Sequence, residues 1–287
     1  MYSSNFIYAI EHAERTLLMY GVDVNPGRWQ GVPTEGRPDL VTKELLNLQL
    51  EVPVNRPFQH FDEKNTLGDR LIEEIKPNIP WAHKHFLERV SRVPSNPGEE
   101  YKNWPWWTGA GTQVDAALTA TDTKFTHTYQ ERFWPKYDHR GMPREGIRYD
   151  YGDLDDVVKM LVADPHTRQA TFPIFFPEDT GAVHGGRIPC TLHYHFMLRG
   201  DKDGVPHLHM WYAIRSCDLV RHFRDDLYMA CRLMLWVIDE CVDKEIESWD
   251  ETGEAEPHVW SDAVPGTLHF TAYSFHVHKG DLHHVRP

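Results

Sequence analysis

The sequence predicts a mixed α/β domain in which helices flank a β-sheet. Segments whose apolar residues recur at helical spacing are interspersed with short runs rich in β-branched and aromatic residues, a composition typical of strands. Two of those runs flank the turn sequence GDKDG, which indicates a β-hairpin. The chain has 287 residues, of which 40% are hydrophobic, and no repeat or shift in composition divides it. We therefore expect one layered domain over residues 1–287.

Four helices are expected along the chain. The first two cover about 5–20 and 82–92, where apolar side chains fall on one side. The third begins after Asp153, a residue type that caps helix N-termini, and ends before a proline. The clearest runs from about 225 to 242 and carries a long apolar stripe. Strands are expected over residues 45–54, 170–176, 190–199, 206–214 and 267–278.

The composition limits the kinds of partner. The formal net charge of −13 argues against a broad basic surface for duplex DNA or anionic lipid, since neutralising phosphates needs clustered Lys and Arg. No apolar run of about 18 residues occurs, and the N-terminal segment has the pattern of an amphipathic helix. We therefore expect a cytoplasmic protein that binds neither a nucleic acid polymer nor a membrane.

The cysteines indicate one reactive thiol rather than a disulfide framework. Cys190, Cys217, Cys231 and Cys241 show no CxxC spacing and are too few to cross-link a chain of this length. Cys190 stands at the start of a predicted strand, three residues after Arg187, and thiolates are favoured beside cations. Cys190 is therefore the candidate nucleophile, and the alternative is a buried structural cysteine.

A polar cluster follows the next predicted strand. Arg215 and Ser216 offer a fork of donors and a hydroxyl, the groups that bind a phosphate monoester, although a solvated turn also explains such a pair. Asp218 comes next, and Asp225 and Asp226 stand where the long helix starts. One helix cap needs one acid, so the second is available to accept a hydrogen bond from an exocyclic amine such as cytosine N4.

Together these segments resemble the thymidylate synthase superfamily, and most closely its phage-type deoxycytidylate hydroxymethylase branch. The resemblance is carried by four segments with the family's spacing: DPHTRQATFPIF, IPCTLHYHFML, RSCDLVRHFRDD and GTLHFTAYSFHVH. It covers roughly residues 125–285. It implies a thymidylate synthase-like layered fold, a sheet-to-sheet homodimer and 5,10-methylenetetrahydrofolate as co-substrate, with no metal.

The resemblance also implies roles for the residues that bind and attack the nucleotide. Cys190 would add to C6 of the pyrimidine and turn C5 into a carbon nucleophile, with Tyr129 near the reacting carbon. Arg215 and Ser216 would hold the phosphate. Arg168 would reach the same phosphate from the partner subunit of the homodimer.

Departures from the family's pattern weaken some contacts. Gln169 replaces the second of the family's paired arginines, and Arg28 in the N-terminal loop is a candidate for a further phosphate contact. His276 matches the family's sugar-binding histidine, whereas His278 stands where the family has tyrosine. No residue placed by the resemblance contacts a 2′-hydroxyl, so ribose and deoxyribose are both open, and the family likeness favours deoxyribose.

Two further residues would face the folate cofactor. Asp218 would lie against the pterin. Trp106, in the Trp-rich segment NWPWW, is a candidate to stack on the pterin or the base, and packing in an aromatic core is the alternative.

Asp226 decides the expected substrate. Eleven residues after Arg215 the synthases of this family have asparagine, and the hydroxymethylase branch has aspartate. A carboxylate only accepts hydrogen bonds, so it would face O4 of uracil acceptor to acceptor, whereas the N4 amine of cytosine donates to it. We therefore expect a cytidine nucleotide as substrate. Asp225 is the alternative residue for this contact.

The expected reaction adds water after one-carbon transfer. C5 attacks the methylene of the folate, tetrahydrofolate leaves, and water completes a hydroxymethyl group, which requires a general base. Glu88, on the second predicted helix, is the candidate base, and a plain solvated helix residue is the alternative. Such a product suits a phage that modifies its DNA, in which case the host cytoplasm is the compartment.

Four other functions stay open from the sequence. The nearest is a thymidylate synthase that methylates dUMP, and the enzyme could also hydroxymethylate CMP or dUMP. The HxH pairs at 193/195, 207/209 and 276/278 would suit a metal-dependent hydrolase, but no third ligand has a compelling spacing. A nucleotide-sensing or RNA-binding protein without catalysis is the last.

Overall fold

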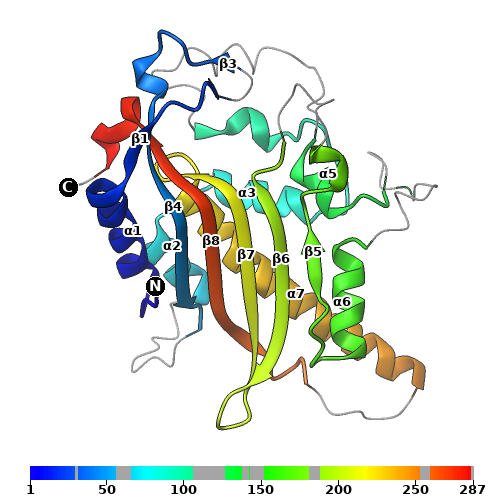
Figure 1. Ribbon diagram of the computed structural model, residues 1–287. Coiled ribbons are helices and arrows are strands. Elements are labelled where there is room, and N and C mark those ends of the chain that lie inside the picture. The colour runs from blue at the N-terminus through cyan, green and yellow to red at the C-terminus, as the bar shows by residue number, and fades with distance from the viewer. Residues whose placement is uncertain are drawn as a thin grey trace.

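The chain forms a mixed α/β structure with one six-stranded sheet flanked by helices, which confirms the predicted class (Figure 1). In the sheet, the strand order is β1-β4-β8-β7-β6-β5; β7 and β8 are parallel, and the other neighbours are antiparallel. The computed structural model describes residues 1–29, 32–55, 66–105, 127–137, 142, 152–180, 188–252 and 259–285.

The five predicted strands all form, with shifted ends. The sheet contains β1 (Val22–Val24), β4 (Thr42–Pro53), β5 (Thr171–Pro173), β6 (Thr191–Gly200), β7 (Pro206–Asp218) and β8 (Val264–His278). A separate pair comprises β2 (Arg28–Trp29) and β3 (Val32–Pro33). The short strand β1 is not evident from the sequence, because three residues carry too little alternation to mark a strand.

The helices are more numerous than predicted. They are α1 (Phe6–Tyr20), α2 (Leu67–Ile75), α3 (Trp81–Arg89), α5 (Tyr129–Phe133), α6 (Leu154–Ala163) and α7 (Phe223–Thr252), with 3-10 turns at Pro38–Leu40, Glu100–Asn103, Pro177–Thr180 and Lys279–His284. Asp153 caps α6 as expected, with its side chain accepting from the Asp156 amide. Helix α7 continues beyond residue 242 because its polar second half consists largely of residues with good helix propensity.

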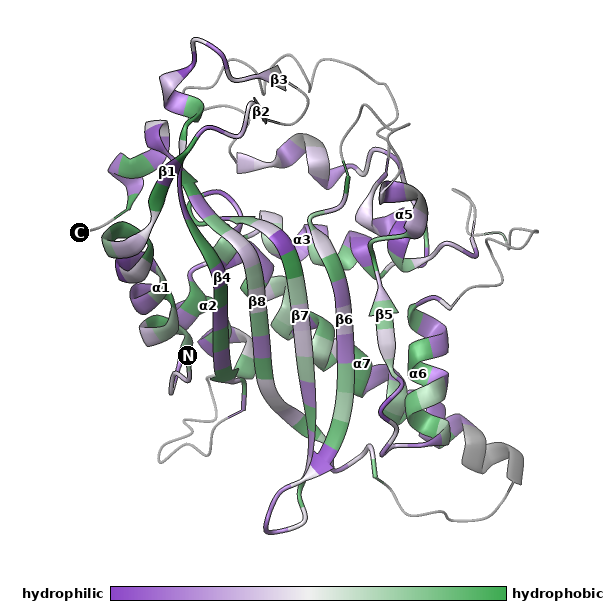
Figure 2. Ribbon diagram, in the orientation of Figure 1, coloured by the Kyte–Doolittle hydropathy of each residue, from purple (hydrophilic) through white to green (hydrophobic). Residues whose placement is uncertain are grey.

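Helices cover one face of the sheet. In Figure 1, α7, α3 and α2 lie behind the strands. Hydrophobic residues alternate with polar ones along the strands in Figure 2. The buried side of the strands contributes apolar side chains, among them Phe196, Met210 and Phe270. The opposite face, toward the viewer in Figure 1, carries no helix in the described part of the chain.

A kink crosses four strands at one level. Along a regular strand buried side chains recur every second residue, but here the step is three residues from Thr191 to Tyr194, from Ile214 to Cys217 and from Ala272 to Phe275. Thr191 pairs with Ile214, and Ile214 with Ala272, so the three irregularities are aligned. Strand β4 shows the same step, from the partly buried Leu45 to Leu48, and Leu48 pairs with Ala272. The kink separates the longer part of the sheet, which has a further register shift between Leu208 and Met210, from a short end that carries polar residues.

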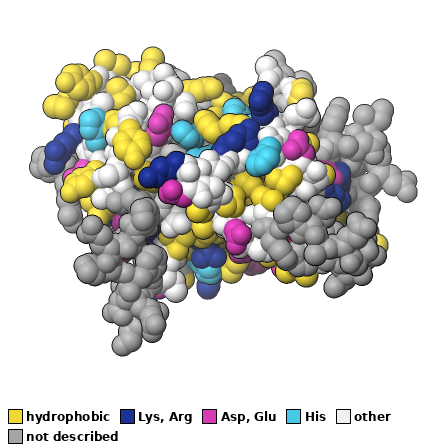
Figure 3. Space-filling view, turned by 90° about the horizontal axis from the view of Figure 1, so that it is seen from below, with side chains coloured by type: hydrophobic (Ala, Val, Ile, Leu, Met, Phe, Trp, Pro, Cys, Tyr) yellow, Lys and Arg dark blue, Asp and Glu magenta, His cyan; other side chains and the backbone are white. Residues whose placement is uncertain are grey.

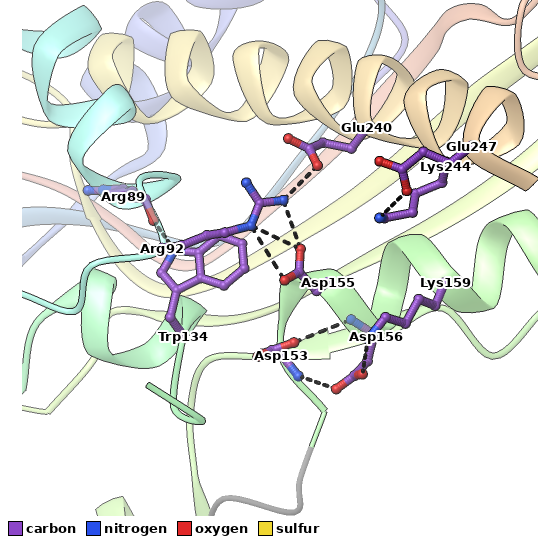
Figure 4. A network of polar contacts seen from close by, with 10 residues as sticks. All are labelled: Arg89, Arg92, Trp134, Asp153, Asp155, Asp156, Lys159, Glu240, Lys244 and Glu247. Carbon is purple, nitrogen blue, oxygen red and sulfur yellow. Dashed lines mark hydrogen bonds and ion pairs between the residues drawn. The ribbon is translucent and has the colours of Figure 1, made fainter. Parts of the chain in front are cut away.

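An ion-pair network fixes the end of α3 against α6 and α7 (Figure 4). Arg92 donates to Asp155 over 2.9 Å and to Glu240 over 2.6 Å. The indole of Trp134 donates to the backbone carbonyl of Arg89 over 2.7 Å. These contacts hold the last turn of α3, and with it the side chain of Arg89, in a defined position.

Among the described residues, the face of the molecule in Figure 3 carries side chains of both charges, without the broad basic surface that the composition also argues against. That view, from the end of the molecule with the β6–β7 turn, has acidic, basic and histidine side chains interspersed with hydrophobic ones. None of the helices in the described ranges has the length and apolar character needed to cross a membrane.

Candidate functional site

Cys190 and Arg215 meet at the short end of the sheet. The backbone amide of Arg215 donates to the Cys190 carbonyl over 2.8 Å, and its guanidinium donates to the carbonyls of Pro189 and Ile188, both over 2.9 Å. The same guanidinium places Nη2 3.7 Å from the Cys190 sulfur. The sulfur, which is half-buried, therefore has a positive charge beside it, the arrangement in which reactive thiolates occur.

Tyr129 lies against this segment. Its hydroxyl accepts from the Thr191 amide over 3.4 Å and from the Thr191 hydroxyl over 3.3 Å. The Arg89 guanidinium covers its ring at 4.2 Å. Burial raises the pKa of the Tyr129 phenol, and negative charge on Cys190 or Asp226 raises it further. Tyr129 is therefore within electrostatic reach of both the candidate nucleophile and the candidate base-contacting acid.

Asp226, in the first turn of α7, faces the same region. One of its oxygens lies 3.9 Å from the Cys217 sulfur. Burial raises the pKa of Asp226 to about 7, although the positive charge of Arg89 acts in the opposite direction. The thiol of Cys217 has a strongly raised pKa, because it is buried and because Asp226, Asp218 and Cys190 all act on it. The contact with Cys217 thus places Asp226 against β7, two residues along that strand from Arg215.

The neighbouring Asp225 has a structural partner. It accepts from the backbone amide and from the side-chain amide of Asn78, both over 2.8 Å, and it is 1% exposed. These bonds join the start of α7 to the segment between α2 and α3. Both oxygens of Asp225 are engaged, so Asp226 is the better candidate to contact a base.

Asp218 and the two C-terminal histidines form a second cluster. Asp218 pairs with His276 across β7 and β8, and His278 follows two residues later on β8. Nε2 of His278 lies 3.7 Å from the Asp218 carboxylate. Burial opposes the charge of Asp218, but His276, His278, His222 and Arg221 outweigh it, so its pKa is lowered. Burial lowers the pKa of His276. A ligand atom from each of the three residues lies within 4.8 Å of the other two, so this cluster could hold a cation.

The candidate phosphate residues are divided between two places. Ser216 is half-buried on β7 beside Arg215, where it pairs with Ser274 of β8. Arg168 and Gln169 lie in the exposed turn before β5. Arg168 precedes the edge strand β5, whereas Arg215 lies on the interior strand β7, and the role of Arg168 in a phosphate site stays a prediction.

Glu88 is engaged by its own neighbourhood. One oxygen accepts from the Glu99 amide over 2.6 Å, and the other lies 3.5 Å from Nδ1 of His85. Burial would raise the pKa of Glu88, but the hydrogen bonds from His85 and from the amides of Glu99 and Glu100 outweigh it and lower that pKa. These contacts give Glu88 a structural role on α3, and its role as a base stays a prediction.

Two predicted residues cannot be placed in the site. Trp106 lies outside the described residues, and Arg28 belongs to β2 but its side chain is outside the described part. Trp104, from the same Trp-rich segment, stacks on His222 with ring centroids 4.9 Å apart. Trp104 is 7% exposed, so it packs as a core residue.

Sequence reasoning missed Arg89. It is 6% exposed, it covers Tyr129, and its Nη2 lies 3.0 Å from Nε2 of His85. A signal was present, since Trp81, Ala82, His85, Phe86 and Arg89 form one buried stripe at helical spacing. An arginine in such a stripe is rarely buried without a charged partner or a ligand.

Comparisons with known proteins leave the family open. A scan against protein-family models finds no match to this chain, and a search of curated proteins finds none either.

Proposed function

We propose that this chain is a folate-dependent enzyme that hydroxymethylates C5 of a cytidine nucleotide, with dCMP as the substrate. Cys190 adds to C6, and C5 attacks the methylene of 5,10-methylenetetrahydrofolate. C5 then loses its proton and tetrahydrofolate leaves, which gives an exocyclic methylene at C5. Water then adds to the exocyclic methylene and the Cys190 bond breaks, which gives 5-hydroxymethyl-dCMP. Arg215 and Ser216 hold the phosphate in this scheme, His276 and His278 the sugar, and Asp218 the pterin.

The observation that carries the proposal is the position of Asp226 beside Cys217 of β7, the strand that also carries Arg215. Because Asn78 engages both oxygens of Asp225, Asp226 is the acid available to a pyrimidine. Its ionised carboxylate accepts from N4 of cytosine and opposes O4 of uracil. A buried mismatch of this kind costs about 1–3 kcal/mol, roughly ten- to a hundredfold in preference.

The protonation of Asp226 adds a condition. With a pKa raised to about 7, this acid is present in both forms near neutrality. Its neutral form has an O–H that can donate to O4, so only the ionised form discriminates against uracil. The preference for dCMP over dUMP should therefore grow as the pH rises through about 7.

The mass of the product tests the proposal. The protein is incubated with dCMP and methylenetetrahydrofolate, and a gain of CH₂O with release of tetrahydrofolate is the expected result. If dUMP is the nucleotide that reacts, and it gains CH₂ while the folate is converted to dihydrofolate, the chain is instead a thymidylate synthase. Parallel reactions with CMP and dUMP separate the remaining nucleotide substrates. Loss of activity with a chelator, without any dependence on folate, would favour the hydrolase.

A homodimer belongs to the same proposal. The face of the sheet without helices carries several half-buried residues, including Trp211, His269 and Met197. A second copy packed on this face would cover them and would bring its exposed Arg168 toward the phosphate site. Light scattering of the purified chain tests the dimer, and mixed dimers of Arg168→Ala and Cys190→Ala variants test the shared site, because one complete site would re-form.

A further inference from the structure

We propose that Asp218, His276 and His278 bind one divalent transition-metal ion. The carboxylate and the two imidazoles each offer one ligand atom, and these atoms all lie within 4.8 Å of one another. Two imidazoles and one carboxylate form a donor set typical of Zn²⁺ and Fe²⁺ sites that keep coordination positions open. The inference requires neither Cys190 nor a pyrimidine, and it competes with part of the proposed function, because an ion bound here would occupy the three residues assigned there to the sugar and the pterin.

Two adjacent strands bring the donors together. Asp218 is the last residue of β7 and pairs with His276 in the parallel β7–β8 ladder. His276 and His278 are two residues apart on β8, so their side chains point to the same face. Asp218 is the third ligand for this HxH pair, which sequence spacing could not supply because the whole of α7 separates it from β8.

The backbone sets the tautomer of His278. Its Nδ1 lies 3.3 Å from the Leu40 carbonyl oxygen, which can only accept a hydrogen bond. Nδ1 therefore carries the proton, and the lone pair is on Nε2, which faces Asp218 at 3.7 Å. Metal-binding histidines have this arrangement, in which the second ring nitrogen donates to a backbone carbonyl or a carboxylate.

His276 has a matching outer contact. The Ser274 hydroxyl bonds to the Glu44 carboxylate and so uses its only proton there. The same hydroxyl oxygen lies 3.5 Å from Nδ1 of His276 and must therefore accept from it. The lone pair of His276 is again on Nε2, so both imidazoles are prepared to act as ligands.

The carboxylate of Asp218 is also held in place. Its Oδ1 accepts from the amides of Val220 and Arg221 over 2.9 and 3.0 Å. Arg221 Nε lies 3.9 Å from Oδ2 but only 2.8 Å from Asp281, and both members of that ion pair are 1% exposed. Asp281 therefore balances the nearest cationic side chain, and Oδ2 keeps its negative charge available to a metal.

Titration with Co²⁺ tests the site, because Co²⁺ occupies such sites and gives a visible d–d spectrum. The expected result is one Co²⁺ per chain, displaced by Zn²⁺. Asp218→Asn and His276→Gln should each weaken the affinity by at least about tenfold, since each removes one direct ligand. Circular dichroism and thermal unfolding establish that each variant is folded, and His276, which is only half-buried, provides the second variant if Asp218→Asn unfolds.

The chain offers a matched control in another HxH pair. His193 and His195 have the same spacing on β6 and lack a third ligand among the described residues. The His193→Gln/His195→Gln double variant should bind Co²⁺ like the unmodified chain. Equal affinity in Asp218→Asn and His276→Gln, or absence of stoichiometric binding, would overturn the proposal.

The two proposals assign different ligands to the same three residues, so each needs its own test. Cys190→Ala should keep the Co²⁺ site unchanged while it loses dCMP turnover. If the chain binds Co²⁺ at Asp218 but never converts dCMP, the metal site stands and the hydroxymethylase is refuted. If it converts dCMP but binds no Co²⁺, the hydroxymethylase stands and the metal site is refuted.

Discussion

Two histidine-rich regions of the sheet share a sequence pattern and differ in chemistry. On the open face, the side chains of His193, His195, His207, His209 and His269 are half-buried. Their contacts are diverse: His195 bonds to Thr171 over 2.7 Å, and His269 stacks on Trp211 at 4.3 Å. Beyond the kink, His276 and His278 share one buried carboxylate. The HxH pattern alone therefore does not define a site; the third residue and the burial do.

The open face and the acidic start of α7 also respond to pH with opposite signs. Burial lowers the pKa of His193, His195, His209 and His269, so protonating them is costly and stability falls as the pH drops below their unfolded value of about 6.5. Burial raises the pKa of Asp225 to about 6 and of Asp226 to about 7, so stability falls as the pH rises from their unfolded value of about 3.8 toward those values. Over this acidic range the two regions therefore act in opposite directions, and variants of each region separate their contributions.

The largest expected effect comes from Cys190, beside Arg215. Cys190→Ala should lower dCMP turnover by about 10⁴-fold or more, because it removes the group that the proposal assigns to the bond with C6. Tritium release from C5 of labelled dCMP measures the loss. Cys241→Ala, a buried cysteine of α7, is the matched control and should keep its turnover. Comparable turnover in Cys190→Ala would remove the nucleophile from the proposal.

The next effect distinguishes the two adjacent acids. Asp226→Asn should shift the preference from dCMP toward dUMP by roughly ten- to a hundredfold, because an amide can donate to O4. The ratio of kcat/KM for the two nucleotides measures it. Asp225→Asn should leave that ratio unchanged and lower the stability by about 1–3 kcal/mol, since it weakens the bonds to Asn78. If Asp225→Asn alone changes the ratio, Asp225 contacts the base.

Features that depend on residues close together in the chain could be predicted from the sequence, whereas contacts between distant residues could not. The capping Asp153 and the hairpin turn GDKDG were predictable because each acts within a few residues; Gly204 has the positive φ of 84° that such a turn requires. The bond between Asn78 and Asp225 joins residues 147 apart, and no local pattern encodes it. The kink depends on the alignment of four strands, which only the pairing fixes. Fold class was therefore predictable, whereas the partners within the site were not.

A smaller effect concerns the stability cost of charging Asp226. In the unfolded chain this acid titrates near 3.8, and in the folded chain at about 7, so the folded state is favoured by protonation and destabilised as the pH rises between these values. Asp226→Asn should therefore stabilise the protein by about 1–3 kcal/mol at a pH of about 8, after discounting for the partial exposure of this side chain. Urea unfolding at several pH values measures the difference, which should vanish at a pH of about 4. A difference independent of pH would mean that Asp226 is not the titrating group.

The smallest effect tests the opposite sign on the open face. Burial lowers the pKa of His193, so its protonation destabilises the folded state as the pH falls below about 6.5. His193→Gln removes that cost and should stabilise the protein by less than about 1 kcal/mol at a pH of about 5, since solvent screens this half-buried group, with no gain at a pH of about 8. His12→Gln, on the exposed side of α1, is the control and should leave the pH profile unchanged. The same urea titration measures both variants. If a second copy covers this face, the gain for His193→Gln should increase with protein concentration, because protonation would then also oppose association.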